Sequence, residues 1–170
     1  SLFFFFSFFP AFFFPFLLFF PLFCFSLLFS FPLFLLLSSC YLFLGSITLI
    51  VPSYNDLQSL PLFYPAVCDV AQTLPDYQMT FLLINDGSKD NTLQIMRDLA
   101  AKDERVKYLS FSRNFGKEAA MYAGFCNAEG DYVAVMDADM QDPPSLLPQM
   151  IKILEKEGYD SVATRRVTRD

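Results

Sequence analysis

Histidine is absent from this chain of 170 residues, and no charged residue precedes Asp56. Without histidine, the commonest partner of cysteine in zinc sites is missing. The cysteines are widely spaced and form no CxxC pair; they are Cys24, Cys40, Cys68 and Cys126. We therefore expect no zinc site, and we predict reduced, buried thiols, which are typical of a cytosolic environment, instead of a disulfide framework.

Basic residues are scarce as well. The first is Lys89, and the 12 Lys and Arg are outnumbered by 18 Asp and Glu, which gives a net charge of -6 and a pI near 4.5. A groove for nucleic acid needs clustered Lys and Arg along the phosphate path, so we expect no nucleic-acid partner. The chain also lacks GxGxxG and GxxxxGK[ST], so neither a dinucleotide fingerprint nor a P-loop is present.

Residues 1–45 form a low-complexity segment composed almost wholly of Phe, Leu, Ser and Pro. Its length and apolarity suggest a membrane anchor, although prolines interrupt each candidate helix and no Lys or Arg flanks it. All four of these amino acids have codons made only of pyrimidines, so a misassigned reading frame is an equal alternative. We predict that the segment carries no chemistry and that a separate domain spans residues 46–170.

From residue 46 onward, short apolar runs alternate with helical patterns. Alternation of this kind predicts an α/β fold with a parallel sheet covered by helices on both faces. Asp142 resembles a helix N-cap, with Pro143 at the first helical position. We expect strands over 47–52, 79–85, 105–112 and 132–139, another starting near 159, and helices ending near Leu74 and over 91–102, 116–128 and 143–157.

Polar motifs follow each of the first four predicted strands. In open parallel sheets, ligands bind outside the carboxyl ends of the strands, so four loops are expected to meet on one rim. These loops are 53–56, 85–90, 112–114 and 137–142.

The segment MDADMQD places oxygen donors at alternate positions, Asp137, Asp139 and Gln141. Alternate residues of a strand point the same way, and carboxylates with few other protein ligands suit Mg²⁺ or Mn²⁺. The alternative is a solvated acidic turn, which is the usual meaning of an isolated DxD.

Each of two further motifs has both a ligand-binding and a structural interpretation. In NDGSKDNT, Asp86 at a strand end could hold a base or ribose hydroxyl, whereas Ser88 or Asp90 could simply cap the next helix. In SRNFGKEAA, Arg113 and Lys117 beside a helix N-terminus could meet phosphate oxygens, although an ordinary surface loop has the same composition.

The apolar side chains that follow SRNFGKEAA have a simpler explanation. Met121, Tyr122 and Phe125 are expected to pack in the core.

Taken together, LIVPSYND, LLINDGSKDNT, SFSRNFGKEAAMYAGFCNAEGDYVAVMDADMQDPP and YDSVATRR resemble glycosyltransferase family 2, specifically its polyprenyl-phosphate branch, which includes dolichol-phosphate mannosyltransferases and bactoprenol glucosyltransferases. The resemblance covers roughly residues 46–170 and implies a GT-A fold that binds a UDP- or GDP-sugar. By position it implies a nucleotide-sugar site and a site for Mg²⁺ or Mn²⁺; the first comprises Pro52, Tyr54, Asp56, Asp86, Arg113, Lys117 and Asp137, and the second Asp137, Asp139 and Gln141.

The resemblance further implies an inverting, metal-dependent enzyme that transfers a sugar to a polyprenyl-phosphate lipid at a membrane surface, with its catalytic domain in the cytoplasm. Alternatives are a relative that acts on a glycan or surface polymer, and an inactive nucleotide-sugar-binding fragment. The family continues beyond ATRRVTRD with acceptor-binding elements, so the chain resembles a truncated, donor-binding half with poor turnover.

Overall fold

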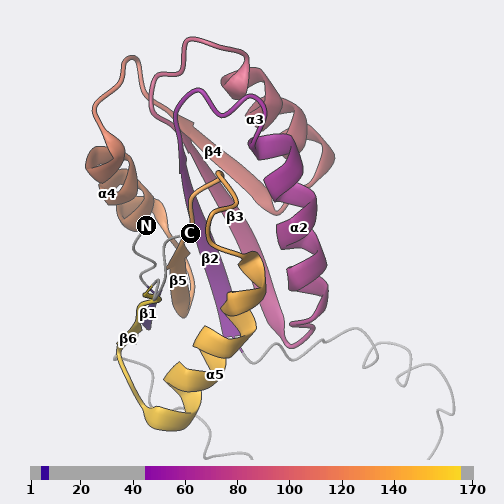
Figure 1. The fold of residues 1–170 in the computed structure, drawn as a ribbon, viewed down its shortest axis with the longest axis vertical. Helices are drawn as coiled ribbons and strands as arrows, with labels where there is room; N and C mark the ends of the chain where they lie inside the picture. Colours follow the sequence, from indigo (N-terminus) through magenta and orange to yellow (C-terminus); the bar gives the residue numbers. More distant parts are fainter. Residues whose placement is uncertain (1–4, 8–44, 166–170) are drawn as a thin grey trace, which may run out of the picture. The chain divides into compact units, whose positions relative to one another are not determined.

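The computed structural model describes residues 5–7 and 45–165. Their strands form a sheet in the order β4-β3-β2-β5-β1-β6 (Figure 1). The strands are β1 (Phe5–Ser7), β2 (Gly45–Ser53), β3 (Tyr77–Asn85), β4 (Val106–Ser110), β5 (Tyr132–Val135) and β6 (Ser161–Val162).

The helices connect consecutive strands. They are α2 (Leu60–Gln72), α3 (Thr92–Lys102), α4 (Lys117–Asn127) and α5 (Leu147–Glu157), and a 3-10 turn, η1 (Pro144–Leu146), precedes the last of them.

Strands β4, β3, β2 and β5 are parallel. In β2 the seven residues from Ile47 to Ser53 are all buried, because helices cover both faces of the strand. The order of these strands reverses direction at β2, with β3 on one side and β5 on the other. Such a switch point opens a crevice at the carboxyl ends of the strands.

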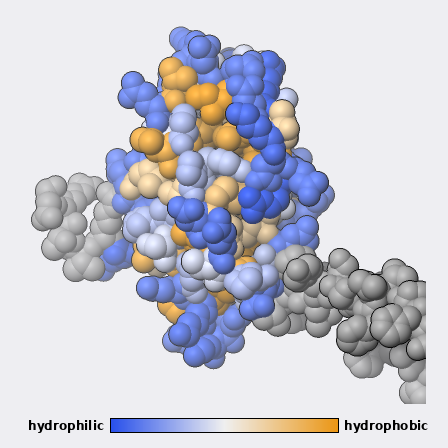
Figure 2. All heavy atoms as spheres, turned by 90° about the vertical axis from the view of Figure 1, so that its right-hand side faces the viewer, coloured by the Kyte–Doolittle hydropathy of each residue, from blue (hydrophilic) through white to orange (hydrophobic). Residues whose placement is uncertain are grey.

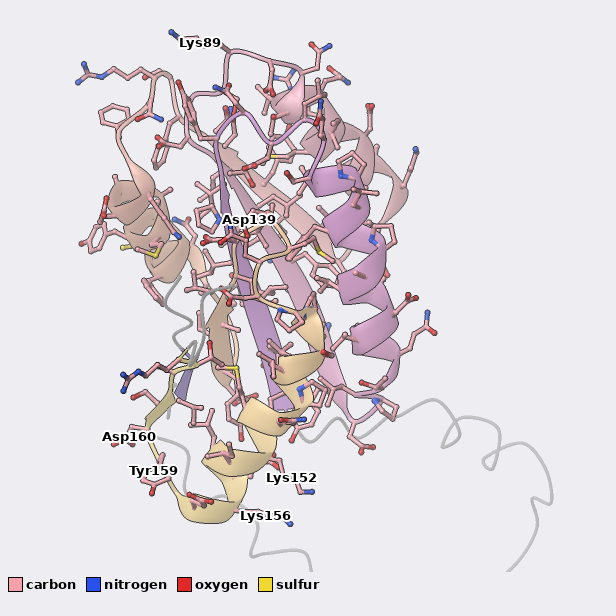
Figure 3. All side chains as sticks on the ribbon, in the orientation of Figure 1. Lys89, Asp139, Lys152, Lys156, Tyr159 and Asp160 are labelled. Carbon is pink, nitrogen blue, oxygen red and sulfur yellow. The ribbon has the colours of Figure 1, made fainter. Side chains whose placement is uncertain are left out.

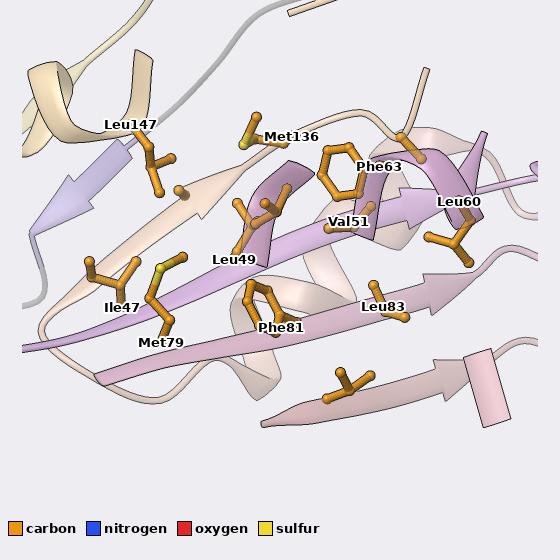
Figure 4. Packing of buried hydrophobic residues seen from close by; sticks show 14 of the residues in the cluster. Ile47, Leu49, Val51, Leu60, Phe63, Met79, Phe81, Leu83, Met136 and Leu147 are labelled. Atoms are coloured by element: carbon orange, nitrogen blue, oxygen red, sulfur yellow. The ribbon is translucent and has the colours of Figure 1, made fainter. Parts of the chain in front are cut away.

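The two faces of the sheet are covered unequally. Helices α2, α3 and α5 pack on one face, where Leu49, Phe63 and Phe81 belong to the larger core cluster (Figure 4). The other face carries Ile50 and Ile84 in a smaller cluster that α4 covers. The predicted parallel sheet with helices on both faces is therefore confirmed.

Helix α4 lies unusually close to the sheet. A Cβ atom on Gly124 would lie 2.4 Å from Cγ2 of Ile50, so only glycine permits this approach. The outer side of the helix is exposed: Tyr122 is 72% accessible and Phe125 36% accessible. The prediction that these aromatic residues pack in the core was wrong, because a helix against one face of a sheet buries only one side.

Two predicted boundaries in the last third of the domain were wrong. Strand β5 ends at Val135, not at 139, so both acids of DAD lie in a loop. The N-cap position is not Asp142 but Pro143 for the 3-10 turn, where ψ is 129°, and Leu146 for α5. A residue before proline is disfavoured in the helical region, which explains the delay of α5.

Most of the low-complexity segment lies outside the described residues, so the alternatives for it stay predictions. Its residues Phe5–Ser7 form a strand that was not predicted and that pairs antiparallel with both β5 and β6. The predicted last strand is confirmed as the short β6. Among the described residues, no helix is both long and apolar enough to cross a bilayer.

The described surface is mixed in polarity. On the side seen in Figure 2, hydrophilic side chains cover most of the surface and hydrophobic ones show between them. Cys68 is half-buried and Cys126 is exposed, and neither forms a disulfide. Reduced thiols are confirmed for these two, whereas burial was wrong for Cys126; Cys24 and Cys40 lie outside the described residues.

Candidate functional site

A cavity of about 310 Å³ lies at the carboxyl ends of the parallel strands. Loops after β2, β3 and β5 line it together with the start of α4, as expected for the switch point beside β2. Asp139 lines the cavity from the loop after β5. Lys89 lies at the outer tip of the loop after β3 (Figure 3). The lining residues are Pro52, Ser53, Tyr54, Asp56, Asp86, Asn114, Gly116, Lys117, Ala120, Asp137, Ala138 and Asp139.

The loop after β2 presents Tyr54 and Asp56. The backbone N–H of Tyr54 donates to Oδ2 of Asp56 at 3.0 Å, which holds the carboxylate at the cavity wall. Asn55 adopts a positive φ of 58°, a conformation that asparagine tolerates better than most residues. This turn lets the loop expose Tyr54, which is 41% accessible.

Hydrogen bonds join this loop to the loop after β3. The N–H of Asn55 donates to Oγ of Ser88 at 3.0 Å, and its Oδ1 accepts the N–H of Lys89 at 2.9 Å. Asp90 accepts both the N–H and the hydroxyl of Thr92, the first residue of α3, but it lies one position before Asn91, which is the N-cap. These contacts make the two loops one wall of the cavity.

Asp86 fixes the loop between β4 and α4. It is 3% accessible, and its two oxygens accept the backbone N–H groups of Phe115 at 2.7 Å and Gly116 at 2.9 Å. Next to it, Gly87 has a φ of 64°, and a Cβ there would lie 2.2 Å from the carbonyl carbon of Arg113. The loop after β3 therefore lies directly against the loop that leads into α4, and Asp86 orients the beginning of that helix.

Lys117, the first residue of α4, faces the DAD loop. Its Nζ lies 2.5 Å from Oδ2 of Asp137, and the two side chains are 47% and 20% accessible. Asp139 accepts the backbone N–H of Gln141 at 3.0 Å. Ala138 between the acids is buried. The two acids line the cavity through this local turn, not through the strand alternation that the sequence suggested.

The cavity carries an excess of negative charge. Its lining contains Asp56, Asp86, Asp137 and Asp139 against the single cation Lys117. Burial raises the pKa of Asp56, and the nearby carboxylates of Asp139, Asp90 and Asp137 raise it further, while the N–H of Tyr54 opposes the shift. Carboxylates that repel one another in this way favour the binding of a cation.

The donor set fits a hard divalent cation. Asp137 and Asp139 supply carboxylate oxygens, and Mg²⁺ or Mn²⁺ commonly takes one or two carboxylates together with water and substrate phosphate oxygens. Within the described part of the chain, no three His, Cys, Asp or Glu side chains form a metal-binding group by themselves. The two carboxylates suit a cation whose other ligands are water and phosphate oxygens.

Most of the predicted site residues meet in this cavity, and two do not line it. Gln141 is exposed and contributes its backbone N–H to Asp139. Arg113 places its guanidinium 4.7 Å from the centre of the Phe115 ring. Sequence reasoning missed small lining residues that carry no chemical signal of their own, namely Ser53, Gly116, Ala120 and Ala138.

Comparison with known proteins agrees with this geometry. The model of the family described as Glycosyl transferase family 2 matches residues 48–170. The protein CsbB of Bacillus subtilis (strain 168) is 50% identical over 123 residues, which are 72% of this chain and 36% of that protein. A bactoprenol glucosyl transferase of Shigella phage SfV is 43% identical over 123 residues, 72% of this chain and 39% of that protein. The chain thus spans between a third and two fifths of these relatives.

Solved structures share the fold. The mannosyltransferase PcManGT of Pyrobaculum calidifontis, in complex with GDP-Man and Mn²⁺, superposes with a TM-score of 0.53 at 23% identity, over 65% of this chain and 32% of that one. S. aureus TarS 1-349 in complex with UDP-GlcNAc gives a TM-score of 0.53 at 22% identity, over 66% of this chain and 32% of that one. These neighbours have the GT-A fold, which confirms the predicted fold class. The resemblance to the polyprenyl-phosphate branch is also confirmed, and the chain belongs to glycosyltransferase family 2.

Proposed function

We propose that the cavity binds a nucleotide-diphosphate sugar together with Mg²⁺ or Mn²⁺, and that the protein transfers the sugar to a polyprenyl phosphate. One observation carries the proposal: three separate loops and the start of α4 bring Asp56, Asp86, Lys117, Asp137 and Asp139 into one cavity at the switch point. The name of the phage relative, a bactoprenol glucosyl transferase, supports a lipid phosphate as the acceptor.

The residues of the chain divide the work of binding the donor. Tyr54 and Asp56 form the wall where a base and ribose would lie. Asp137 and Asp139 would hold the cation, which when bound neutralises charge on the departing nucleoside diphosphate. Lys117, the one cation of the lining, lies beside Asp137, where it can attract phosphate oxygens. Asp86 contributes indirectly: its two oxygens accept backbone N–H groups and so hold the loop before α4 in place.

A phosphate acceptor does not need a strong general base from the protein. A phosphate monoester has a second pKa of about 6, so it is already largely an anionic nucleophile at neutral pH. Its oxygen attacks the anomeric carbon from the face opposite the diphosphate, the bond to the diphosphate breaks, and the configuration inverts. The cavity residues then need only position the donor and stabilise the leaving group. In this proposal the enzyme works at a membrane surface, with its donor site facing the cytoplasm.

Donor binding is tested by isothermal titration of UDP and GDP into the whole chain, kept in a mild non-ionic detergent because residues 1–45 are so apolar. Titrations with and without Mn²⁺ are compared with those of an Asp137→Ala, Asp139→Ala variant. We expect binding that depends on Mn²⁺ and is lost in the variant, and the preferred nucleotide identifies the donor class. Equal binding by the variant would refute the assigned site.

A further inference from the structure

Lys117 occupies an unusual place for a lysine. It is the first residue of α4, where the helix dipole favours anions over cations. Its Nζ instead lies 2.5 Å from Oδ2 of Asp137, in the loop after β5. A residue that goes against a local preference and meets one specific partner in a ligand site is a candidate for function.

The backbone that carries Lys117 is held in place by specific contacts. Asp86 holds the N–H groups of Phe115 and Gly116, the two residues before Lys117. Gly124 lets the same helix lie directly on Ile50. Asp86 therefore holds the start of α4 and Gly124 packs its second half on the sheet, while the Lys117 side chain is 47% accessible.

We infer that Lys117 is a tethered cation that competes with the divalent ion for Asp137. Both draw on the same carboxylate, and the ammonium group 2.5 Å from Oδ2 neutralises part of the negative charge that Asp137 offers to a cation. The competition keeps the affinity for the ion alone low. A nucleoside diphosphate relieves it, because its phosphate oxygens offer Lys117 another anion. The ion and the nucleotide are then expected to bind cooperatively. This inference rests on the proposed function of the cavity and adds that Lys117 couples the binding of the cation to that of the nucleotide.

The test measures the binding of Mn²⁺ alone by electron paramagnetic resonance, using the whole chain in detergent. Lys117→Gln removes the competitor and is expected to lower the Kd for Mn²⁺ by about three- to tenfold, the range for loss of a half-exposed ion pair together with a nearby positive charge. Lys117→Arg keeps the charge and is expected to bind Mn²⁺ as weakly as the wild type. An unchanged or higher Kd in Lys117→Gln, with a native circular dichroism spectrum, would overturn the inference.

Lys107→Gln is the matched control. Lys107 also pairs with a carboxylate, that of Glu129 at 3.1 Å, but both line a separate cavity with the amino-terminal residues of β2 and β3. Its loss is expected to change Mn²⁺ affinity by less than about twofold. An equal gain in this variant would show that only net charge matters, and would also overturn the inference.

A double-mutant cycle with Asp137→Asn identifies the partner, because the gain from Lys117→Gln should disappear when Asp137 is already neutral. Cooperativity supplies a second measurement: UDP or GDP should strengthen Mn²⁺ binding more in the wild type than in Lys117→Gln, and Mn²⁺ should strengthen nucleotide binding by the same factor. Mn²⁺ binding that depends on Asp137 but ignores Lys117 would refute this inference alone. No Mn²⁺ binding by any variant, with or without nucleotide, would refute the proposed function as well.

Discussion

Asp86→Asn separates a structural role for this acid from direct binding of a nucleotide. In the native protein the two oxygens of Asp86 accept the backbone N–H groups of Phe115 and Gly116. Asparagine keeps one oxygen, and its NH₂ group faces the other N–H and cannot accept a hydrogen bond from it. The site is 3% accessible, so water cannot replace the lost acceptor. A hydrogen bond to a charged group contributes about 1.5–3 kcal/mol and an unsatisfied buried N–H costs about 1–3 kcal/mol, so we expect a net loss of about 2–4 kcal/mol.

The assay is urea unfolding of the whole chain in detergent, followed by circular dichroism. With an m-value of about 2 kcal/mol/M, the expected loss moves the midpoint down by about 1–2 M. Asp98→Asn is the control: Asp98 is an exposed acid on α3 that accepts a hydrogen bond from Gln94, and its change should stay within about 0.5 kcal/mol. A midpoint for Asp86→Asn equal to that of the control, with nucleotide binding lost, would refute the structural role and assign Asp86 to the ligand.

Three further changes test the packing and the charges. Gly124→Ala places a methyl group 2.4 Å from Ile50 and should lower the free energy of unfolding in urea by about 1–3 kcal/mol; an unchanged midpoint would show that α4 can shift freely. The hydrogen bond from Arg105 holds the pKa of Asp103 well below its usual range, so Asp103 stabilises the fold above about pH 4 and loses that effect as the pH falls. Asp103→Asn should therefore melt below the wild type at pH 7, and the gap should be clearly smaller at pH 2; a gap of the same size at both would contradict this role of Asp103. Because burial and neighbouring carboxylates raise the pKa of Asp56, its charge opposes folding at neutral pH; Asp56→Asn should raise the melting temperature at pH 7, less so at pH 4, and a lower melting temperature at pH 7 would contradict this.

The α/β order and the position of the site could be predicted because each depends on local signals. Apolar runs bounded by polar loops identified β2 and β3, and the helix expected over 91–102 corresponds to α3. Once a parallel sheet is expected, the convergence of the polar loops follows from the direction of its strands. Asp56, Asp137 and Asp139 line one cavity, so these loops do meet at one edge of the sheet.

What could not be predicted depends on contacts between distant segments. Nothing in NDGS shows that Asp86 turns toward the backbone of residues 115 and 116, since that contact joins loops 29 and 30 positions apart. The Lys117–Asp137 pair spans 20 positions and needs the close approach of α4. The exposure of Tyr122 also depends on tertiary packing, because composition does not tell which side of α4 meets the sheet.

The central claim is that the cavity at the carboxyl ends of the strands holds the cation and the nucleotide. Paramagnetic broadening by Mn²⁺ locates the ion directly, in amide NMR spectra of the whole chain with UDP or GDP. We predict that broadening is strongest around Asp56, Lys117, Asp137 and Asp139 and is absent when Asp137 and Asp139 are alanine. Broadening centred instead on the opposite cavity, around Lys107 and Glu129, or none at all, would contradict the account.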